Sequence, residues 1–448
     1  MMKKVALISP KGNIFGKNEK MRSFLEQSQV MKSFEYLWSG PNLGLLTLAA
    51  LLPADWECDY IDENYVSIDF EKCYDVVFIG AMTQQVTNAY HISDQFRRKG
   101  ILTVMGGIHP TLMPEEALQH ADVVFSGEAE PLIPGFLTDY QSGTLRKIYR
   151  EENPGHYPIS DSPIPRFDLL KGYPYPIITL QTTRGCPRKC SFCAASRVFG
   201  VQYRRKENSR ILAELKMLSQ MYPGILILFA DDNMLVMRRE SKELLRQMIE
   251  LDLRWLAQTD ISIAADDELL ALMVQAGCQW IVVGFESTSY HSLQGLDQDN
   301  WKLKQLPGYP ENIQKIQDYG IGVYGTFIVG LDCDDATVFK NTAGFIKDNR
   351  LYGANITLPT PLPGTELREK LLSEGRVLNK GWEYYTFWDV TIQPKQFSVE
   401  ELEDNLIYIY NEITDNRHVK DRMIMLKKMM SRRNQIRKSV DFSRKEEG

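Results

Sequence analysis

The chain has 448 residues, of which 44% are hydrophobic and 25% charged, so it can bury a core and is not a disordered chain. Its 52 Lys and Arg against 58 Asp and Glu give a net charge of −6, which argues against nucleic acid as the main partner. The first apolar run is too short for a secretion signal, and the longest, residues 43–52, is too short to span a bilayer. We therefore expect a cytoplasmic protein without a membrane span, folded into two or three domains.

The first 130 residues alternate short apolar runs with helical patterns, which is typical of a doubly wound parallel sheet. Helical patterns cover residues 43–52 and 87–99. Strands are expected at Val5–Ser9, Glu57–Asp62, Asp75–Gly80, Ile101–Gly106 and Asp122–Ser126. Ligands of such sheets bind beyond the carboxyl ends of the strands. Because no GxGxxG motif follows the first strand, a dinucleotide is disfavoured.

Periodicity is lost between residues 143 and 176, where closely spaced prolines predict an irregular linker. A second series of six βα units follows, and its spacing indicates a partial or complete parallel barrel with chemistry at the carboxyl ends of its strands. These strands are expected at Ile177–Gln181, Ile225–Ala230, Arg254–Thr259, Trp280–Phe285, Val323–Val329 and Ala354–Leu358.

The region after the barrel is expected to be mostly helical. Its tail, residues 417–448, holds 11 Lys or Arg against 4 acids, and we interpret it as a solvated terminal helix rather than a docking or membrane-surface helix. An aromatic cluster precedes the tail and is either core or the wall of a substrate cavity: Trp382, Tyr384, Tyr385, Phe387 and Trp388. The expected domains are residues 1–140, a linker 141–175, a barrel 176–375 and a C-terminal region 376–448.

Three of the seven cysteines crowd into one segment directly after the first barrel strand, Cys186-Pro-Arg-Lys-Cys190-Ser-Phe-Cys193. Thiolates are the soft ligands that iron-sulfur clusters and zinc prefer. Three cysteines leave one iron of a four-iron cluster without a protein ligand, and a small molecule with chelating nitrogen and oxygen atoms can bind there. Nearby cations would partly offset the negative charge of such a cluster: Arg184, Arg188 and Lys189.

A structural zinc site is the alternative for this segment. It needs a fourth ligand, which His156 or Cys278 would have to supply from a distance. Three unligated buried thiols are disfavoured, because a strand-end loop flanked by basic residues is not a core environment. The scattered cysteines are interpreted as core residues: Cys58, Cys73, Cys278 and Cys333.

The CxxxCxxC spacing, with Phe192 before the last cysteine and a βα barrel around it, resembles the radical S-adenosylmethionine (radical SAM) superfamily. The resemblance continues through Phe229-Ala-Asp-Asp-Asn233, Gly284-Phe-Glu-Ser287, Gly325-Thr-Phe-Ile-Val-Gly330 and Pro361-Leu-Pro-Gly-Thr365. It implies that Cys186, Cys190 and Cys193 hold a [4Fe-4S] cluster. The residues that it assigns to S-adenosylmethionine are Phe192, Asp232, Asn233, Glu286, Ser287, Gly325, Phe327 and Gly330.

Each of these motifs also has an ordinary structural interpretation. Asp231 and Asp232 could cap the helix that follows, and Glu286 could be a solvated loop acid. The glycines could serve tight turns. Their joint position at successive strand ends favours the ligand-binding interpretation.

The first domain resembles the cobalamin-binding domain of the cobalamin-dependent radical branch. The similar segments are Gly40-Pro-Asn-Leu-Gly-Leu45, Gly80-Ala-Met-Thr83, Gly106-Gly-Ile-His-Pro-Thr111 and Gly127-Glu-Ala-Glu130. The DxHxxG motif, whose histidine ligates cobalt in other cobalamin proteins, is missing, and His109 is not placed to replace it. The resemblance implies bound cobalamin and assigns these residues to it: Gly80, Met82, Thr83, Gly106, Gly107, His109, Pro110, Gly127 and Glu128.

The resemblance implies reductive cleavage of S-adenosylmethionine at the cluster, with abstraction of a substrate hydrogen by the 5′-deoxyadenosyl radical. A methyl group from methylcobalamin would then pass to an unactivated centre of a small-molecule substrate. The electrons would come from an external donor such as flavodoxin or ferredoxin. No lone catalytic acid or base can be identified.

Two other interpretations stay open. The first is a radical cyclase, oxidative or rearrangement enzyme of the same branch without methyl transfer. The second belongs to another class, a non-catalytic iron-sulfur or corrinoid carrier. A methylthiotransferase is disfavoured, because it would need a second cysteine triad near the N-terminus.

Overall fold

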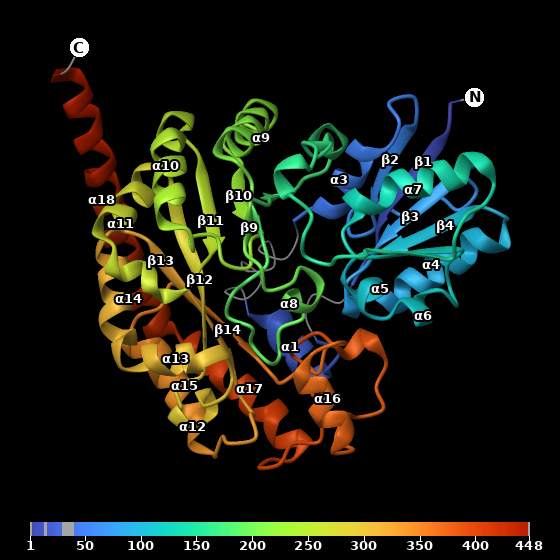
Figure 1. Cartoon of the computed structure of the whole chain (residues 1–448). Coiled ribbons are helices and arrows are strands. Elements are labelled where there is room, and N and C mark those ends of the chain that lie inside the picture. The colour runs from blue at the N-terminus through green and yellow to red at the C-terminus, as the bar shows by residue number, and fades with distance from the viewer. Residues whose placement is uncertain (1, 13–15, 29–39, 447–448) are drawn as a thin grey trace.

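The computed structural model describes residues 2–12, 16–28 and 40–446, with side chains up to residue 437. Two parallel sheets of six strands each lie side by side, and helices cover them (Figure 1). The α/β fold expected from the sequence is confirmed, with a Rossmann-like parallel sheet first, a second parallel sheet of six strands and helices at the C-terminus.

The first sheet has the order β2-β1-β3-β4-β5-β6. Each of the five predicted strands lies within one residue of its predicted bounds. The strands are β1 (Lys4–Ser9), β2 (Glu57–Asp62), β3 (Val76–Gly80), β4 (Leu102–Gly106), β5 (Val123–Ser126) and β6 (Ile148–Arg150). β6 was not predicted, because its three residues are too few to show periodicity and lie in the expected linker.

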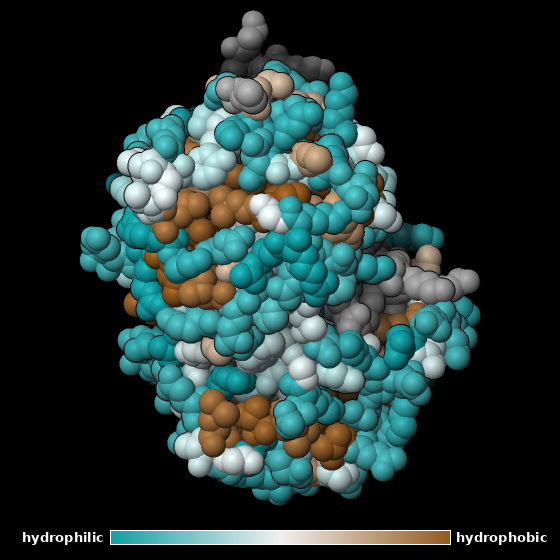
Figure 2. Space-filling model, turned by 90° about the vertical axis from the view of Figure 1, so that its right-hand side faces the viewer, coloured by the Kyte–Doolittle hydropathy of each residue, from teal (hydrophilic) through white to brown (hydrophobic). Residues whose placement is uncertain are grey.

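Helices lie on both faces of this sheet, so its central strands are buried on both sides. Every residue of β3 is buried, which explains its continuous apolar run. The helices of this domain are α3 (Leu43–Leu51), α4 (Val86–Arg98), α5 (Ile108–Leu112), α6 (Pro114–Ala117) and α7 (Ala129–Ser142). The side of the molecule on which this domain lies is mainly hydrophilic, with hydrophobic side chains gathered in separate areas (Figure 2).

The second sheet has the order β14-β13-β12-β11-β10-β7, and its edge strands β7 and β14 do not pair. The barrel is therefore partial rather than complete. Its strands are β7 (Ile177–Leu180), β10 (Leu226–Phe229), β11 (Arg254–Gln258), β12 (Cys278–Glu286), β13 (Gly322–Ile328) and β14 (Gly353–Thr357). The helices between them are α9 (Asn208–Met221), α10 (Arg238–Met248), α11 (Asp267–Gln275), α12 (Tyr290–Leu293), α13 (Trp301–Gln305), α14 (Tyr309–Asp318) and α15 (Thr337–Asp348).

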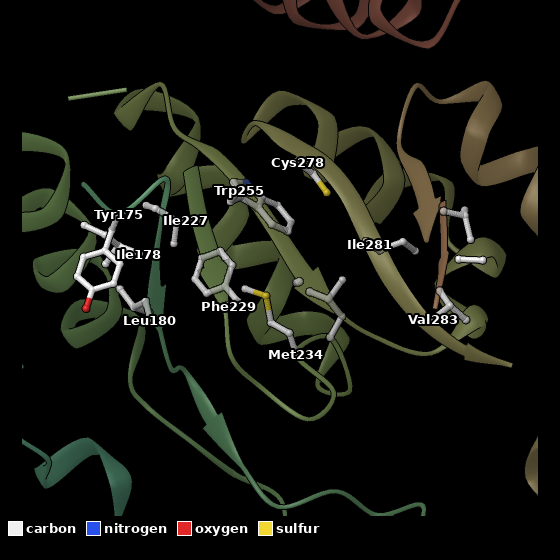
Figure 3. Close-up of a cluster of buried hydrophobic side chains, with 14 of the residues drawn as sticks. Tyr175, Ile178, Leu180, Ile227, Phe229, Met234, Trp255, Cys278, Ile281 and Val283 are labelled. Carbon is white, nitrogen blue, oxygen red and sulfur yellow. The ribbon is translucent and has the colours of Figure 1, made fainter. Parts of the chain in front are cut away.

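The hydrophobic core of the second domain lies between this sheet and its helices. Phe229, Trp255 and Ile281 are fully buried there, and Figure 3 shows them projecting from β10, β11 and β12. Cys278 belongs to the same core and has no exposed surface. It lies at the start of β12, at the opposite end of that strand from Glu286.

The C-terminal region contains one short and two longer α-helices. They are α16 (Glu366–Ser373), α17 (Val399–Ile413) and α18 (Asn416–Glu446). α17 packs against α15 and against α1 (Glu19–Gln27), whereas α18 runs along the outer side of the second domain against α11 and α14 (Figure 1).

The basic tail is more than a solvated helix. Met429 is 3% exposed, and the Arg433 guanidinium donates to the carbonyl of Gly320 at 2.8 Å, so α18 is docked along part of its length. No helix in the described ranges is both long and apolar enough to cross a membrane.

Two residues of the aromatic cluster after the barrel belong to the core. Tyr385 and Trp388 are buried, and the Trp388 indole donates to the Tyr410 hydroxyl of α17 at 3.0 Å. Trp382 and Tyr384 are half-buried, and Phe387 is 36% exposed. The cluster thus joins the C-terminal region to the rest of the fold.

Candidate active site

The cysteine segment is a loop closed by a small antiparallel hairpin. Strand β8 (Thr183–Arg184) ends just before Cys186, and strand β9 (Arg204–Arg205) follows the short helix α8 (Ala195–Val198). Arg184 and Arg204 lie opposite each other in this hairpin. The two ends of the cysteine loop therefore lie side by side.

The three thiols lie within this loop and are partly accessible. Burial raises the pKa of Cys186 to about 11 and that of Cys190 to about 12, and it also raises the pKa of Cys193. Within the described part of the chain, no three His, Cys, Asp or Glu side chains form a compact metal-binding group. The structure thus holds the cysteines in one loop without drawing their sulfurs together.

The proposed zinc ligands lie elsewhere. Cys278 is in the hydrophobic core, and His156 is exposed, with its Nδ1 3.1 Å from the carbonyl oxygen of Pro154. The prediction that all scattered cysteines are core residues was wrong for two of them, because Cys73 is exposed in a loop and Cys333 is exposed in a turn. The candidate donor set is therefore the three loop thiols.

Two predicted carboxylates lie beside these thiols. The negative charge of Asp232 contributes to the raised pKa of Cys186 and Cys193, and that of Glu286 contributes to the raised pKa of Cys190. Burial and the neighbouring Asp231 raise the pKa of Asp232 itself to about 6. The structure thus brings the ends of β10 and β12 to the cysteine loop, as their motifs predicted.

Asp231 supports the entry to the loop. One of its oxygens, Oδ1, accepts hydrogen bonds from the backbone N–H of Thr182 at 2.9 Å and from the Thr183 hydroxyl at 2.6 Å. It caps no helix, since α10 begins at Arg238, seven residues later. The capping interpretation of Asp231 was therefore wrong, and the residue instead fixes the connection between β7 and β8.

Arg188, inside the cysteine loop, is held from two sides. Its guanidinium lies 3.6 Å from the ring centroid of Trp301, and its Nη2 donates to Asp260 at 2.6 Å. The side-chain amide of Asn233 donates to the same oxygen of Asp260 at 2.9 Å. Burial alone would raise the pKa of Asp260, but hydrogen bonds from these groups and Ser262 hold that pKa below its usual value.

Lys302 of α13 was missed by the sequence analysis. Its ammonium group donates to the carbonyl of Gly284 at 2.5 Å and to Glu286 at 3.1 Å. Burial alone would lower the pKa of Lys302, but the charges of Glu286 and Cys190 raise it above its usual value. Glu286 has a φ of +62°, which is uncommon for a residue other than glycine. Ser287 is buried beside it.

The residues in and after β13 that were assigned to S-adenosylmethionine pack against other side chains of the protein. Phe327 is fully buried and stacks on Phe285 with ring centroids 5.5 Å apart, toward α15. A Cβ at Gly325 would lie 2.7 Å from the Phe327 ring, and Gly330 has a φ of +91° beside Leu402. Their assignment to S-adenosylmethionine stays a prediction, as does that of Phe192, which is half-buried within the loop.

The residues predicted to contact cobalamin gather at the carboxyl ends of β3, β4 and β5. Met82 is 45% exposed there, and Gly107 has a φ of +100° that brings it against the backbone of Ala81. His109 is fully buried, with Nδ1 3.3 Å from the Thr83 hydroxyl and Nε2 3.4 Å from Glu116. Its ring also packs against Trp382 at 4.8 Å, so the residue joins the first domain to the C-terminal region.

The two domains meet at the cysteine loop. Helix α5 packs against α8, and Glu128 forms salt bridges with Arg184 and Arg204. We expected Arg184 to offset the charge of a cluster, but Glu128 and Glu130 already balance its charge. The carboxyl ends of the first sheet thus lie toward the cysteine loop of the second domain (Figure 1).

Comparison with known families agrees with this arrangement. A model described as the B12 binding domain matches residues 34–137, and one described as the radical SAM superfamily matches residues 180–342. The chain belongs to the cobalamin-dependent radical SAM family. It is a radical SAM enzyme, and its cofactors are a [4Fe-4S] cluster, S-adenosylmethionine and cobalamin.

Relatives within this family include methyltransferases and cyclases. Bacteriochlorophyllide d C-12(1)-methyltransferase of Chlorobaculum tepidum is 29% identical over 391 residues, which cover 85% of this chain and 84% of the relative. Anaerobic magnesium-protoporphyrin IX monomethyl ester cyclase of Rubrivivax gelatinosus is 25% identical over 346 residues, 71% of this chain and 61% of the relative.

Among solved structures, the chain is similar to the radical SAM methyltransferase TsrM of Kitasatospora setae with cobalamin and a [4Fe-4S] cluster bound. The TM-score is 0.65 at 16% identity, and the match covers 84% of this chain and 78% of that one. At this identity the likeness shows a shared fold.

The side chains of this radical SAM enzyme fit the cofactors. Cys186, Cys190 and Cys193 are free thiols in one loop, and three thiolate ligands match a cluster that keeps one iron open. At the first sheet, glycines end β3 and β4 and follow β5, and a Cβ at Gly80 would meet Leu45 while one at Gly127 would meet Glu151, so these glycines allow close packing at the strand ends.

Proposed function

We propose that this cobalamin-dependent radical SAM enzyme is a methyltransferase acting on an unactivated centre of a small-molecule substrate. The observation that carries the proposal is the approach of the two strand-end edges, because Glu128, two residues after β5, is bonded to both strands that enclose the cysteine loop. Methyl transfer needs the cobalamin side and the radical side to share one substrate cavity.

In this proposal Cys186, Cys190 and Cys193 hold the cluster, and Asp232 and Glu286 orient S-adenosylmethionine beside it. When bound, the reduced cluster and S-adenosylmethionine supply a 5′-deoxyadenosyl radical, and methylcobalamin supplies the methyl group. The chain itself binds and orients these groups and keeps water out of the space between the domains.

The relatives support methyl transfer, since two that cover more than four fifths of this chain are bacteriochlorophyllide methyltransferases. The test is anaerobic reconstitution with iron, sulfide and methylcobalamin, followed by assay with reductant, S-adenosylmethionine and candidate tetrapyrrole substrates. We expect 5′-deoxyadenosine together with a product that is heavier by one CH₂. A product that retains the substrate's carbon count would contradict methyl transfer.

A radical cyclase of the same family is the second candidate, favoured by the similarity to the magnesium-protoporphyrin cyclase. It would form 5′-deoxyadenosine with an oxidised or rearranged product. A non-catalytic carrier would form no 5′-deoxyadenosine with both cofactors and a strong reductant present. We infer further that the reductant in the cell is a flavodoxin or ferredoxin and that the enzyme acts in the cytoplasm.

A further inference from the structure

The base of the cysteine loop carries two arginines that meet one glutamate of the other domain. Arg184 donates through Nη1 to Glu128 Oε2 at 2.5 Å, and Arg204 donates through Nη2 to Glu128 Oε1 at 2.5 Å. A third bond joins Arg204 Nη1 to Glu128 Oε2 at 3.1 Å. Both carboxylate oxygens of Glu128 are therefore engaged.

These charges are withdrawn from solvent. The side chains of Glu128, Arg184 and Arg204 are 1%, 10% and 7% exposed. Glu130 balances the second positive charge by accepting from Arg184 at 2.7 Å, and the hydroxyl of Ser162 donates to the same oxygen. The group of two arginines and two glutamates is neutral as a whole and spans the domain interface.

Stability alone does not account for such a group. A buried ion pair loses solvation that roughly offsets its attraction, so a well-packed apolar contact would hold the domains together as firmly. The charged group instead fixes the geometry of the interface, because a carboxylate held by two guanidinium groups allows one relative placement of the three side chains.

The placement matters because each partner borders a cofactor-binding segment. Glu128 follows Gly127 in a motif predicted to contact cobalamin, and it stands at the N-cap of α7. Arg184 and Arg204 border the segment from 185 to 203 that contains the three cysteines. A shift of either arginine would move the whole loop relative to the first sheet.

We propose that Glu128 is a positioning residue that sets the distance between cobalamin and the [4Fe-4S] cluster through Arg184 and Arg204. The inference rests on the proposed function only where it concerns product formation. Glu128 was predicted to contact cobalamin, but both of its carboxylate oxygens are bonded to Arg184 and Arg204. Loosening this contact should therefore leave both cofactors bound but allow their separation to vary.

The decisive measurement is a pulsed EPR distance distribution between the reduced cluster and the paramagnetic cobalt(II) form of cobalamin in the full chain. Glu128→Gln keeps the shape of the side chain and removes the charge. Glu214→Gln is the matched control, because Glu214 forms an equally buried pair with Lys206, but within the second domain. We expect a broadened or displaced distribution for Glu128→Gln and an unchanged one for the control.

A second measurement compares the amount of methylated product with the amount of 5′-deoxyadenosine, and so reports how well radical formation is coupled to methyl transfer. With iron and cobalt contents equal to those of the wild type, Glu128→Gln should lower the ratio of methylated product to 5′-deoxyadenosine by about 10- to 100-fold, as expected for misplaced reacting groups. Because the distance measurement needs no substrate, it remains decisive if the chain forms no methylated product at all.

Glu128→Gln could fail to fold, so Arg204→Lys is the second variant. The ammonium group of lysine keeps the positive charge but cannot form the two parallel hydrogen bonds that a guanidinium group donates to both carboxylate oxygens. It should broaden the distance distribution, and restoring Arg should reverse the effect. A folded Glu128→Gln or Arg204→Lys variant with the wild-type distribution would overturn the proposal, as would an equal broadening in Glu214→Gln.

Discussion

The ammonium group of Lys302 lies 3.1 Å from the carboxylate of Glu286, and both side chains are about nine-tenths buried. Glu286 stands in the left-handed region of backbone conformation, at a shift in the pairing of β12 with β13. The ammonium group also bonds the carbonyl of Gly284. Lys302 therefore holds the whole strand end on which Glu286 is presented to the cysteine loop.

Lys302→Met should disturb both stability and the cluster. Removing one partner leaves Glu286 buried without its counter-charge, at a cost of about 3–5 kcal/mol in the free energy of unfolding. Loss of a cation near Cys190 should also make the cluster harder to reduce, so its midpoint potential should become more negative. Urea unfolding and potentiometric EPR measure these effects. Lys304→Met, an exposed change on the same helix, serves as the control and should alter neither.

Two cysteine variants, one inside the loop and one outside it, test the ligand assignment. Cys190→Ala should abolish iron binding and cleavage of S-adenosylmethionine together, because a cluster held by two side chains is not retained. Cys73→Ser changes an exposed thiol outside the loop and should bind iron as the wild type does. Iron and sulfide analysis with assay of 5′-deoxyadenosine gives the answer, and a Cys190→Ala enzyme that kept its cluster would refute the assignment.

Much of this architecture follows from local patterns. The strands could be predicted because buried parallel strands read as short apolar runs, as β3 does. Asp232 and Glu286 could be placed near the cysteines because the carboxyl ends of parallel strands meet at one edge. The three candidate cluster ligands could be predicted from the spacing of the cysteines alone.

The remaining features depend on tertiary contacts that no local pattern encodes. Lys302 lies 16 residues after Glu286, on a helix whose sequence has no motif. Glu128 and Arg184 come from different domains, so their pairing is visible only once the sheets are placed. Phe327 belongs to a matching motif, yet strand alternation directs it to the helix-covered face with Phe285.

Trp301 offers a test of the support behind the cysteine loop. Its ring is stacked on the Arg188 guanidinium at 3.6 Å, a geometry in which cation–π attraction contributes about 1–2 kcal/mol when partly desolvated. Trp301→Leu should lower the free energy of unfolding by at least that amount and slow cluster assembly. Trp301→Phe retains an aromatic face and should lose less. Equal losses in the two variants would show that packing, rather than the ring's attraction for Arg188, sets the effect.

Asp231 predicts a pH dependence of stability. Burial raises its pKa from 3.8 to about 6, so the folded protein binds a proton there more tightly than the unfolded chain does. Proton binding by Asp231 therefore stabilises the folded protein to its full extent below pH 3.8, and this stabilisation is lost as the pH rises through about 6. A shift of this size corresponds to about 3 kcal/mol.

The test is the difference in free energy of unfolding between the wild type and Asp231→Asn, measured from pH 3 to pH 7. Because asparagine keeps an oxygen for the Thr182 and Thr183 donors but does not titrate, the stability of the wild type relative to the variant should fall by up to about 3 kcal/mol as the pH rises. Asp266→Asn is the control of opposite sign. Despite some desolvation, hydrogen bonds from Lys242 and the Leu269 amide lower the pKa of Asp266, so its contribution to stability should grow as the pH rises. If Asp231→Asn followed the Asp266 trend, its carboxylate would be ionised and stabilised by the threonine donors at neutral pH.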